Sequence, residues 1–339
     1  MDESVGTVWL SFMLCVILIG VAGSRLSRYG DVIADKIGMG GTWVGLILLA
    51  TVTSLPELIT GVSAVTLANT PDIAVGNILG SCVINLSLIT VLDFLIRGAS
   101  VYSRVSQGHI LSAGFGIILI GIIGFNLLIV TNGWTVSLGH IGLYSVVIVV
   151  LYAIAVRTVF RYEQAKQKEF VEEIAERYPD VTLRGAILRY ALSALVVIAA
   201  GVWLPFIGAE LASVMGWGQS FVGTLFVAMV TTIPEATVTI TALRLGALDM
   251  AISNLLGSNL FNVLILAIDD VFFIKGPLLS HVSTLHAVSA LSAVMMSGVV
   301  IVGLLYRPQT RLFKTVGWTS LFLFSLYLLN SFVLYLYGK

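Results

Sequence analysis

Charge is the property that this sequence has least of. Asp, Glu, Lys and Arg make up 11% of the 339 residues, whereas 58% are hydrophobic and the mean hydropathy is +1.02. An average soluble domain carries about 25% charged residues, so a soluble fold is excluded, and we expect no nucleic-acid partner. Apolar stretches of roughly 17–25 residues, the length that crosses a bilayer as a helix, recur along the chain. The sequence therefore predicts an all-α polytopic protein that lies in the lipid bilayer.

Cysteine and histidine are also scarce. Cys15 and Cys82 both lie in apolar stretches, where free cysteines behave as small buried hydrophobes, and two of them indicate no disulfide framework. The four histidines are scattered, with no carboxylate at the spacing of a zinc site. No convincing nucleophile and base stand together. We therefore expect neither an enzyme nor a bound cofactor.

The apolar stretches predict ten transmembrane helices, five on each side of a charged loop. They cover residues 8–24, 44–67, 73–95, 110–130, 138–158, 187–204, 221–243, 250–268, 285–305 and 315–337. Residues 25–41 are expected to form a short interfacial segment after the first helix. The predicted domains are an N-terminal five-helix repeat at 1–160, a cytoplasmic linker at 161–184 and a C-terminal five-helix repeat at 185–339. Mixed charges at helical spacing predict a solvated helix in the linker.

The distribution of Lys and Arg predicts the orientation. With the N-terminus outside, all of the 18 Lys and Arg residues except Lys275 and Lys339 fall in cytoplasmic loops, as the positive-inside rule expects. The acidic residues 1–4 lack the positive region of a cleaved signal, so the first apolar stretch is expected to remain as a helix. We predict a multi-pass protein of the prokaryotic cytoplasmic membrane with both termini outside.

A polar motif occurs twice within this apolar sequence. Residues 53–57 read TSLPE and residues 231–235 read TTIPE, and each is followed by a second match, GNILGS at 76–81 and SNLLGS at 253–258. Aligning Glu57 with Glu235 also pairs Gly45 with Gly223, Ala50 with Ala228, Val52 with Val230, Thr53 with Thr231 and Pro56 with Pro234. After a one-residue gap, the alignment pairs Asp72 with Asp249, Asn77 with Asn254, Gly80 with Gly257, Ser81 with Ser258, Asn85 with Asn262 and Asp93 with Asp270.

The duplicated segments predict an inverted repeat. Because five spans precede the charged loop, the second copy of the motif enters the membrane in the opposite orientation. Two Pro-broken, acidic segments in matching positions of two halves are typical of an ion site at a repeat interface. The remaining spans show no comparable match, so the duplicated function is expected in these segments.

The repeated residues are suited to a hard cation. Glu57 and Glu235 supply charge, and no Lys or Arg lies in the central part of a predicted span to neutralise it. The other candidate ligands are the hydroxyls of Thr53, Ser54, Ser81, Thr231, Thr232 and Ser258, the amides of Asn85 and Asn262, and backbone carbonyls near Ala50 and Ala228. Pro56 and Pro234 lack an N–H, which frees a carbonyl four residues earlier in each helix.

An oxygen-only ligand set favours Ca²⁺, Na⁺ or Mg²⁺ over transition metals. Ca²⁺ takes about 6–8 oxygens in a flexible arrangement. Two carboxylates neutralise one divalent ion, or equally two or more monovalent ions or two protons. The residues themselves therefore favour ion exchange and leave the pair of ions open.

Several of these residues also have a structural interpretation. Pro56 can be a simple kink, and Gly76, Gly80 and Gly257 can be packing positions between helices. Asp72 and Asp249 stand at helix starts, where they are expected to act as caps or dipole partners. Asp93 and Asp270 stand near helix ends and are expected at the membrane interface.

At these motifs the sequence resembles the calcium/cation antiporter superfamily. The resemblance implies alternating access, with Na⁺ or H⁺ entering as Ca²⁺ leaves, and it implies that Glu57 and Glu235 are the central Ca²⁺ ligands. It also implies Na⁺ sites formed by the six hydroxyls and by the carbonyls of Ala50 and Ala228. The TSLPE sequence looks more like the sodium-coupled branch. Two departures are Asn262, where many sodium exchangers have an acidic residue, and Cys82, where the second repeat has Asn259.

We therefore expect an antiporter that exchanges Ca²⁺ for Na⁺, and no oligomer is required. The alternatives are an antiporter of H⁺ and Ca²⁺ or of another divalent cation and, less favoured, a cation channel. A channel can use the same oxygen ligands, but it normally forms a continuous pore, whereas inverted repeats and central carboxylates are typical of transporters.

Overall fold

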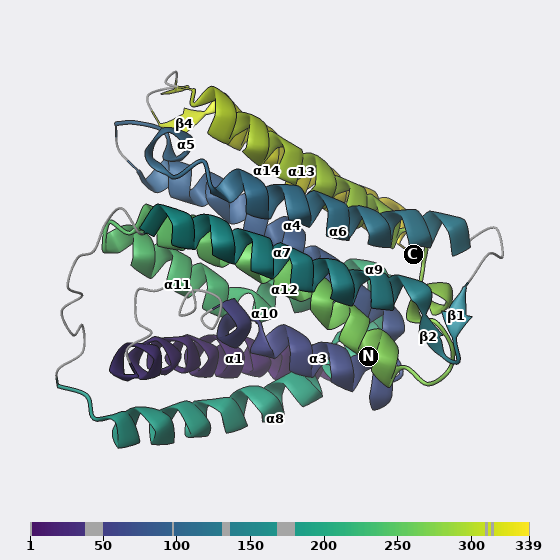
Figure 1. Cartoon of the computed structure of the whole chain (residues 1–339). Coiled ribbons are helices and arrows are strands. Elements are labelled where there is room, and N and C mark those ends of the chain that lie inside the picture. The colour runs from purple at the N-terminus through teal and green to yellow at the C-terminus, as the bar shows by residue number, and fades with distance from the viewer. Residues whose placement is uncertain are drawn as a thin grey trace.

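The fold is a bundle of long helices with two small β-hairpins (Figure 1). The computed structural model describes residues 2–37, 50–96, 98–130, 136–167, 180–308, 311–312 and 315–338. The helices of the first half are α1 (Asp2–Lys36), α3 (Leu55–Thr66), α4 (Pro71–Leu95), α5 (Val101–Arg104), α6 (His109–Val130) and α7 (Leu143–Gln167). Those of the second half are α8 (Leu183–Met215), α9 (Gln219–Val222), the π-helix η1 (Gly223–Val227), α10 (Ala228–Thr231), α11 (Ile233–Arg244), α12 (Leu248–Phe272), the 3-10 helix η2 (Leu278–His281), α13 (His286–Tyr306) and α14 (Trp318–Tyr337).

The helices confirm a polytopic membrane protein. Eight of the described helices are long and apolar enough to span a bilayer, and the bent pair formed by residues 219–231 and 233–244 makes nine. The predicted span 44–67 is represented by residues 50–53 and α3, and its first part lies outside the described residues. The count of ten and the orientation of the termini stay predictions.

One predicted segment is wrong. Residues 25–36 do not form a separate interfacial element, because α1 continues without a break from Asp2 to Lys36. Residues 38–41 lie outside the described part. The charged residues at 25–36 occupy the last turns of a helix that is longer than the bilayer is thick, which is how long helices place Arg and Lys at the interface. In the linker, α7 extends to Gln167, and residues 168–179 lie outside the described ranges.

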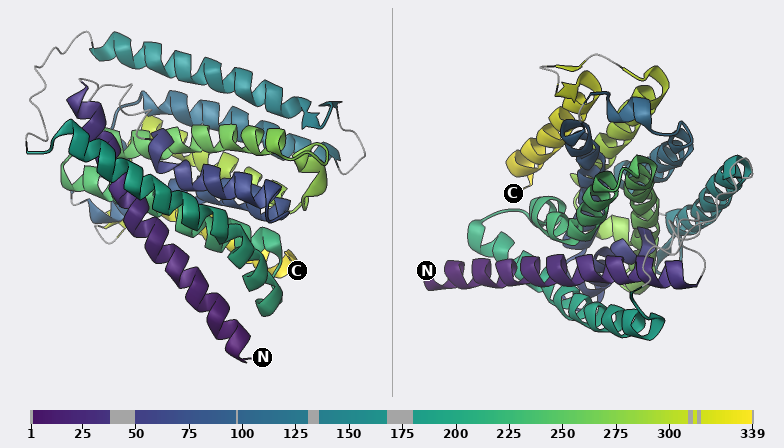
Figure 2. Two further views of the ribbon diagram at one scale, coloured as in Figure 1. Left: turned by 90° about the horizontal axis from the view of Figure 1, so that it is seen from below. Right: turned by 90° about the vertical axis from the view of Figure 1, so that its left-hand side faces the viewer.

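The helices α1 and α8 form an antiparallel pair on one side of the bundle (Figures 1 and 2). Tyr29 near the end of α1 contacts Arg189 near the start of α8, with 3.3 Å between the phenol oxygen and Nη1. At the other end of the pair, Trp9 packs edge-on against Trp217. The pair covers the broken segments, because Gly201 of α8 lies against Ile59 and Gly23 of α1 lies against Pro234.

The internal repeat extends further than the sequence motif. An antiparallel hairpin, β1 (Ser137–Leu138) with β2 (Ile141–Gly142), joins α6 to α7. A second one, β3 (Arg311–Leu312) with β4 (Val316–Gly317), joins α13 to α14 in the same way. The two halves therefore correspond in structure also at these hairpins, where their sequences show no comparable match.

Asp93 and Asp270 hold the ends of α4 and α12 to the opposite half of the chain. Asp93 accepts hydrogen bonds from Ser100 Oγ, Val101 N, Gly317 N and Ser320 Oγ at 2.8–3.0 Å. Asp270 accepts them from Gly142 N, Tyr144 OH, Ser145 Oγ and Leu278 N at 2.6–2.8 Å. Both carboxylates are fully buried within the protein, and they stand in the last turns of α4 and α12. Their placement at the membrane interface stays a prediction. A buried carboxylate with this many donors is satisfied, which indicates a structural role.

The opposite ends of α4 and α12 carry a second matched pair of contacts. His286 Nε2 lies 3.0 Å from Asp72 Oδ1, and His109 Nε2 lies 2.8 Å from Asp249 Oδ1. The backbone N–H of Ser283 and that of Ser106 donate to the same two carboxylates at 2.7 Å. The N-cap residues are Thr70 and Ala247, so the cap alternative is wrong, whereas Asp72 and Asp249 stand in the first turns, where a helix-dipole partner is expected. Each Asp also binds a helix of the other repeat. The histidines, scattered in the sequence, have carboxylate partners in space.

Glycine allows α4 to approach the second broken segment closely. A Cβ at Gly76 would lie 2.9 Å from Thr224 N, and one at Gly80 would overlap the Thr224 carbonyl and lie 2.7 Å from Ala228 Cβ. The wider turn of the π-helix η1 occurs at this crossing, and such turns are frequent at functional sites. In the other repeat, Gly257 faces Ala50 in the corresponding way, at 3.3 Å. The packing interpretation of these glycines is confirmed.

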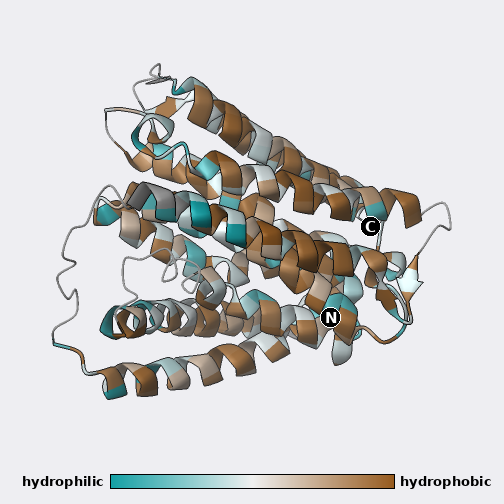
Figure 3. Ribbon diagram, viewed as in Figure 1, coloured by the Kyte–Doolittle hydropathy of each residue, from teal (hydrophilic) through white to brown (hydrophobic). Residues whose placement is uncertain are grey.

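Hydrophobic residues predominate along the helices (Figure 3), and many large ones are exposed. Exposed large side chains such as Leu10, Phe125, Leu188 and Phe332 lie on different helices. Contiguous exposure of this kind is unusual for a soluble monomer and is expected for lipid-facing helices. The buried polar residues, in contrast, gather on α4, α12 and the broken helices.

Gly80→Ala should destabilise the protein, because the added methyl group overlaps backbone that cannot move independently of η1. We expect a loss of about 1–3 kcal/mol, the usual cost of overpacking, seen as a lower midpoint of heat-induced unfolding in detergent. Gly114→Ala on α6 is the matched control, since a Cβ there meets nothing within 4 Å. Equal midpoints for the two variants would contradict this account of the crossing.

Candidate ion-binding site

Two helices break where the repeated motif lies. The helical residues 50–53 stop at a turn at Ser54 before α3, and α10 is separated from α11 by Thr232 with a bend of 46°. Pro56 and Pro234 stand in the first turns of α3 and α11, where proline is tolerated because no N–H is needed there. The local sequence therefore ends one helix and begins another at each motif, and it places Glu57 and Glu235 in first turns.

The two glutamates are completely buried. Glu57 Oε1 accepts a hydrogen bond from Ser81 Oγ at 3.3 Å. Glu235 Oε1 accepts bonds from Ser54 Oγ at 2.9 Å and from Ser258 Oγ at 3.5 Å. The second carboxylate oxygen, Oε2, of each glutamate has no hydrogen-bond partner among the described residues. A buried carboxylate that is only half satisfied is costly, so both glutamates are suited to bind a cation or a proton.

Hydroxyl groups join the two copies of the motif. Thr53 Oγ1 lies 3.3 Å from Ser258 Oγ, and Thr231 Oγ1 lies 3.5 Å from Ser81 Oγ. Thr232 Oγ1 also donates to Ser81 Oγ at 3.0 Å. The structure therefore places the six predicted hydroxyls in two hydrogen-bonded groups, each with residues of both repeats. Thr53, Ser54 and Ser258 lie around Glu235, and Ser81, Thr231 and Thr232 lie around Glu57.

The carbonyls of Ala50 and Ala228 accept hydrogen bonds from these hydroxyl groups. The Ala50 carbonyl belongs to the group around Glu235, and the Ala228 carbonyl belongs to the group around Glu57. The Ala50 carbonyl accepts bonds from Ser54 N at 3.2 Å and from Thr53 Oγ1 at 3.0 Å. The Ala228 carbonyl accepts bonds from Thr232 N and from the hydroxyls of Thr231 and Thr232. Both carbonyls are thus hydrogen-bonded here, and an ion would have to replace a hydroxyl as their partner.

Asparagine side chains complete the cluster. Asn85 Nδ2 donates to Asn259 Oδ1 at 3.0 Å, whereas neither amide atom of Asn262 has a hydrogen-bond partner in the described part of the chain. Asn77 and Asn254 donate to the backbone carbonyls of Glu57 and Glu235 at 3.5 and 3.4 Å.

The sequence analysis did not include Asn77, Asn254 and Asn259 among the candidate ligands. A signal for two of them was present, because Asn77 and Asn254 occupy matching positions of the repeat.

Within this cluster, five buried carboxylate and amide oxygens are left without a hydrogen-bond partner among the described residues. They are Oε2 of Glu57 and Glu235 and Oδ1 of Asn85, Asn254 and Asn262. Carboxylate and amide oxygens of this kind are the ligands that hard cations take. In the membrane interior, the charge of two acidic groups has to be neutralised, and bound protons or cations can do this.

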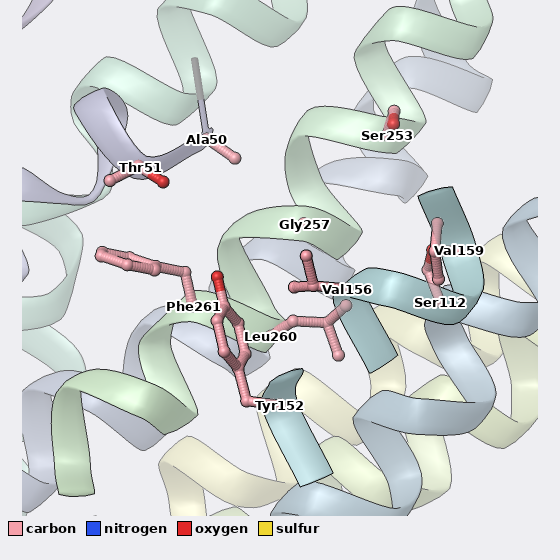
Figure 4. Close-up of a pocket in the computed structure, with 10 residues that line it drawn as sticks. All are labelled: Ala50, Thr51, Ser112, Tyr152, Val156, Val159, Ser253, Gly257, Leu260 and Phe261. Carbon is pink, nitrogen blue, oxygen red and sulfur yellow. The ribbon is translucent and has the colours of Figure 1, made fainter. Parts of the chain in front are cut away.

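A small cavity lies beside the first broken segment (Figure 4). It has a volume of about 40 Å³ and is lined by Ala50, Thr51, Ser112, Tyr152, Val156, Val159, Ser253, Gly257, Leu260 and Phe261. Ala50 and Gly257 border both the cavity and the contact between the repeats. The cavity can hold a water molecule or a small ion next to the Ala50 end of the hydroxyl network.

The sequence matches a known family over almost its whole length. The family model described as "Sodium/calcium exchanger protein" matches residues 7–158 and 185–335. The inner membrane protein YrbG of Escherichia coli is 25% identical over 252 residues, which are 74% of this chain and 75% of that protein.

Solved structures share the fold. An "H+/Ca2+ Exchanger CAX" has a TM-score of 0.71 at 14% identity and covers 98% of this chain and 85% of its own. The "sodium-calcium exchanger NCX_Mj" has a TM-score of 0.57 at 21% identity and covers 95% of this chain and 97% of its own. The family that the motifs indicated is confirmed.

Thr231→Val should destabilise the folded protein, because it keeps the shape but removes the hydroxyl that donates to Asn77 Oδ1 and to the Ala228 carbonyl. Leaving a buried acceptor unpaired costs about 1–3 kcal/mol, which thermal unfolding in detergent can detect. Thr60→Val is the matched control, since its buried hydroxyl has no partner within the described residues. A control as unstable as Thr231→Val would refute the importance of the network.

Proposed function

The chain belongs to the sodium/calcium exchanger protein family, and we propose that it is a secondary antiporter that exchanges Ca²⁺ for Na⁺ across a membrane by alternating access. The observation that carries the proposal is the pair of fully buried glutamates, Glu57 and Glu235, which lie close enough to interact electrostatically. Each has one carboxylate oxygen without a hydrogen-bond partner among the described residues. They come from two matching segments, and this is where secondary transporters with inverted repeats bind their ions.

Ca²⁺ would bind between the two glutamates. Their four carboxylate oxygens and the unpaired amide oxygens of Asn85 and Asn262 supply six of the about 6–8 oxygens that Ca²⁺ takes. The two negative charges neutralise one divalent ion, which removes the main cost of keeping the cluster in a low-dielectric interior.

Na⁺ would bind in the flanking hydroxyl network. Thr53, Ser258 and the Ala50 carbonyl form one hydrogen-bonded group, and Thr231, Ser81 and the Ala228 carbonyl form its counterpart. In each group a Na⁺ ion would replace the hydroxyl protons as partner of the carbonyl oxygen. The cavity beside Ala50 offers a route to the first group.

Alternating access would couple the two ions through charge. An empty cluster carries two uncompensated carboxylates, whereas a loaded one is neutral, so only the loaded cluster should pass easily between its two accessible states. The α1–α8 pair is the element suited to move, because it contacts the broken segments through Gly23 on Pro234 and Gly201 on Ile59.

Exchange of H⁺ for Ca²⁺ is the second candidate. Asn262 is neutral and leaves the cluster with only two acidic groups. The TM-score to the H⁺/Ca²⁺ exchanger is higher than that to the sodium-calcium exchanger. In this mechanism the two glutamates would carry protons on the return step.

Ca²⁺ uptake into proteoliposomes tests the proposal. We expect saturable uptake driven by an outward Na⁺ gradient, and Glu57→Gln and Glu235→Gln should each lower it to background while the purified protein stays folded. Mutation of a residue that only hydrogen-bonds to a metal ligand typically lowers metal affinity or activity by about 10–100-fold. The loss of a carboxylate that binds the ion directly should lower Ca²⁺ uptake by at least as much. Glu210→Gln, which changes an exposed carboxylate on α8, is the matched control and should transport normally.

The driving gradient separates the candidates. Uptake driven by a pH gradient alone would replace Na⁺ by H⁺ as the coupled ion. Uptake at the rate of open pores would contradict the antiporter in favour of a channel. Wild-type Ca²⁺ uptake that persists in both glutamine variants would contradict the assignment of the site.

A further inference from the structure

One further acidic side chain, Asp269, is buried in the membrane-spanning part without a hydrogen-bond partner among the described residues. Asp269 of α12 is 1% exposed, and neither of its carboxylate oxygens has a hydrogen-bond partner among the described residues. Its neighbour Asp270 differs completely, because that carboxylate accepts hydrogen bonds from four groups. Hydrogen bonds therefore explain the burial of Asp270, but they do not explain the burial of Asp269.

The Asp269 carboxyl lies against the helix that carries Glu57. A Cβ built at Gly61 would be 2.8 Å from Asp269 Oδ1 and 2.9 Å from Cγ, and it would overlap Oδ2. Gly61 follows Glu57 by four residues, which is about 6 Å along a helix. Asp269 also follows Asn262 by seven residues, so the two lie on the same face of α12, two turns apart. The carboxyl thus lies about one helical turn from Glu57 along α3 and two turns from Asn262 along α12, toward the C-terminal end of α12.

Among the described residues, no cationic side chain contacts Asp269. The ionisable groups on the elements around this end of α12 are Glu57 of α3, Asp72 of α4 with its partner His286 of α13, His140, Tyr144 of α7, Asp270, Lys275 and His281. His140 and His281 bind backbone carbonyls of Val271 and Pro277, Lys275 binds Asn69, and Tyr144 binds Asp270. Residues 191–209 of α8, which cover α3, contain no ionisable side chain. The remaining groups are acidic and would disfavour a second charge beside them.

The surroundings suit a proton better than a metal ion. Ca²⁺ or Na⁺ needs several oxygens, whereas the group that meets this carboxyl, Gly61, offers no side chain. A proton requires no further ligand and leaves the buried carboxyl uncharged, which is the inexpensive state in a low-dielectric interior.

We propose that Asp269 is a proton-carrying site coupled to the central cluster. When Ca²⁺ enters between Glu57 and Glu235, its positive charge favours the carboxylate form of Asp269, and the proton leaves to solvent. When Ca²⁺ leaves, the carboxylate takes a proton back. The proposal rests on the proposed binding of Ca²⁺ at the two glutamates, and it supplies the titratable group that Asn262 does not provide.

The proton site is present in only one repeat. The alignment that pairs Asp93 with Asp270 places Leu92 opposite Asp269. Because the first repeat has no equivalent acidic residue, the proton site lies on one side of the ion cluster only. Leu92 also shows which side chain this position of the fold accepts when no proton is carried.

Proton release on Ca²⁺ binding tests the proposal directly. Ca²⁺ is added to the purified full-length protein in weakly buffered detergent solution, and bound Ca²⁺ and released H⁺ are measured together. Asp269→Asn should release about one proton fewer per Ca²⁺ than wild type, because metal binding and proton release are linked through the groups that titrate. Glu210→Gln should release as many protons as wild type.

Asp269→Leu, which copies Leu92, is the second variant and guards against a folding defect in the first. It should unfold at the wild-type temperature or above, since no hydrogen bond is lost, and it should show the same proton deficit. Ca²⁺ binding with unchanged proton release in both variants would overturn the role of Asp269 and leave the proposed function intact. Absence of Ca²⁺ binding in wild type would overturn the proposed function itself.

Discussion

The structure depends on keeping two carboxylates, Glu57 and Glu235, in the middle of an apolar helical bundle. Neither is paired with a cationic side chain within the described residues, so their charge has to be met by oriented dipoles or by bound ions. The broken helices, the serine and threonine hydroxyls and the asparagine amides around them all serve this requirement. Hydrogen bonds satisfy one oxygen of each carboxylate and leave the other open. The incomplete satisfaction is what makes the cluster able to bind and release ions.

The helices behind the cluster are held by exchanged contacts between the two halves of the chain. Each of α4 and α12 is bound at one end by a histidine of the opposite half and at the other end by the hairpin and helix of the opposite half. The central ligands on α4 and α12 are therefore fixed from both ends. In contrast, α1 and α8 pack mainly on each other and on the broken segments, which fits a division into a fixed core and a moving pair.

The differences between the two copies are as informative as their similarity. Ser54 donates to Glu235, whereas its counterpart Thr232 donates to Ser81 and to the Ala228 carbonyl. Cys82 has the counterpart Asn259, and the two meet each other across the centre of the crossing of α4 and α12. Asp269 has the counterpart Leu92. A fully symmetric cluster would bind the same ions from either side of the membrane. We therefore expect the selection of the coupled ion to depend on the positions at which the two repeats differ.

The amino-acid sequence alone was enough to predict the membrane class, the family and the twelve candidate site residues, because long apolar stretches and a duplicated acidic motif are local patterns. Tertiary structure decided what depends on packing between the halves. The spacing of residues did not reveal the histidine partners of Asp72 and Asp249, because each partner lies more than a hundred residues away in the sequence. Nor did it reveal the full length of α1 or the burial of Asp93 and Asp270, because both depend on how the helices pack. The same reason applies to Asp269. Its residue type is visible in the sequence, but only the fold shows that its carboxyl lies against Gly61 without a partner.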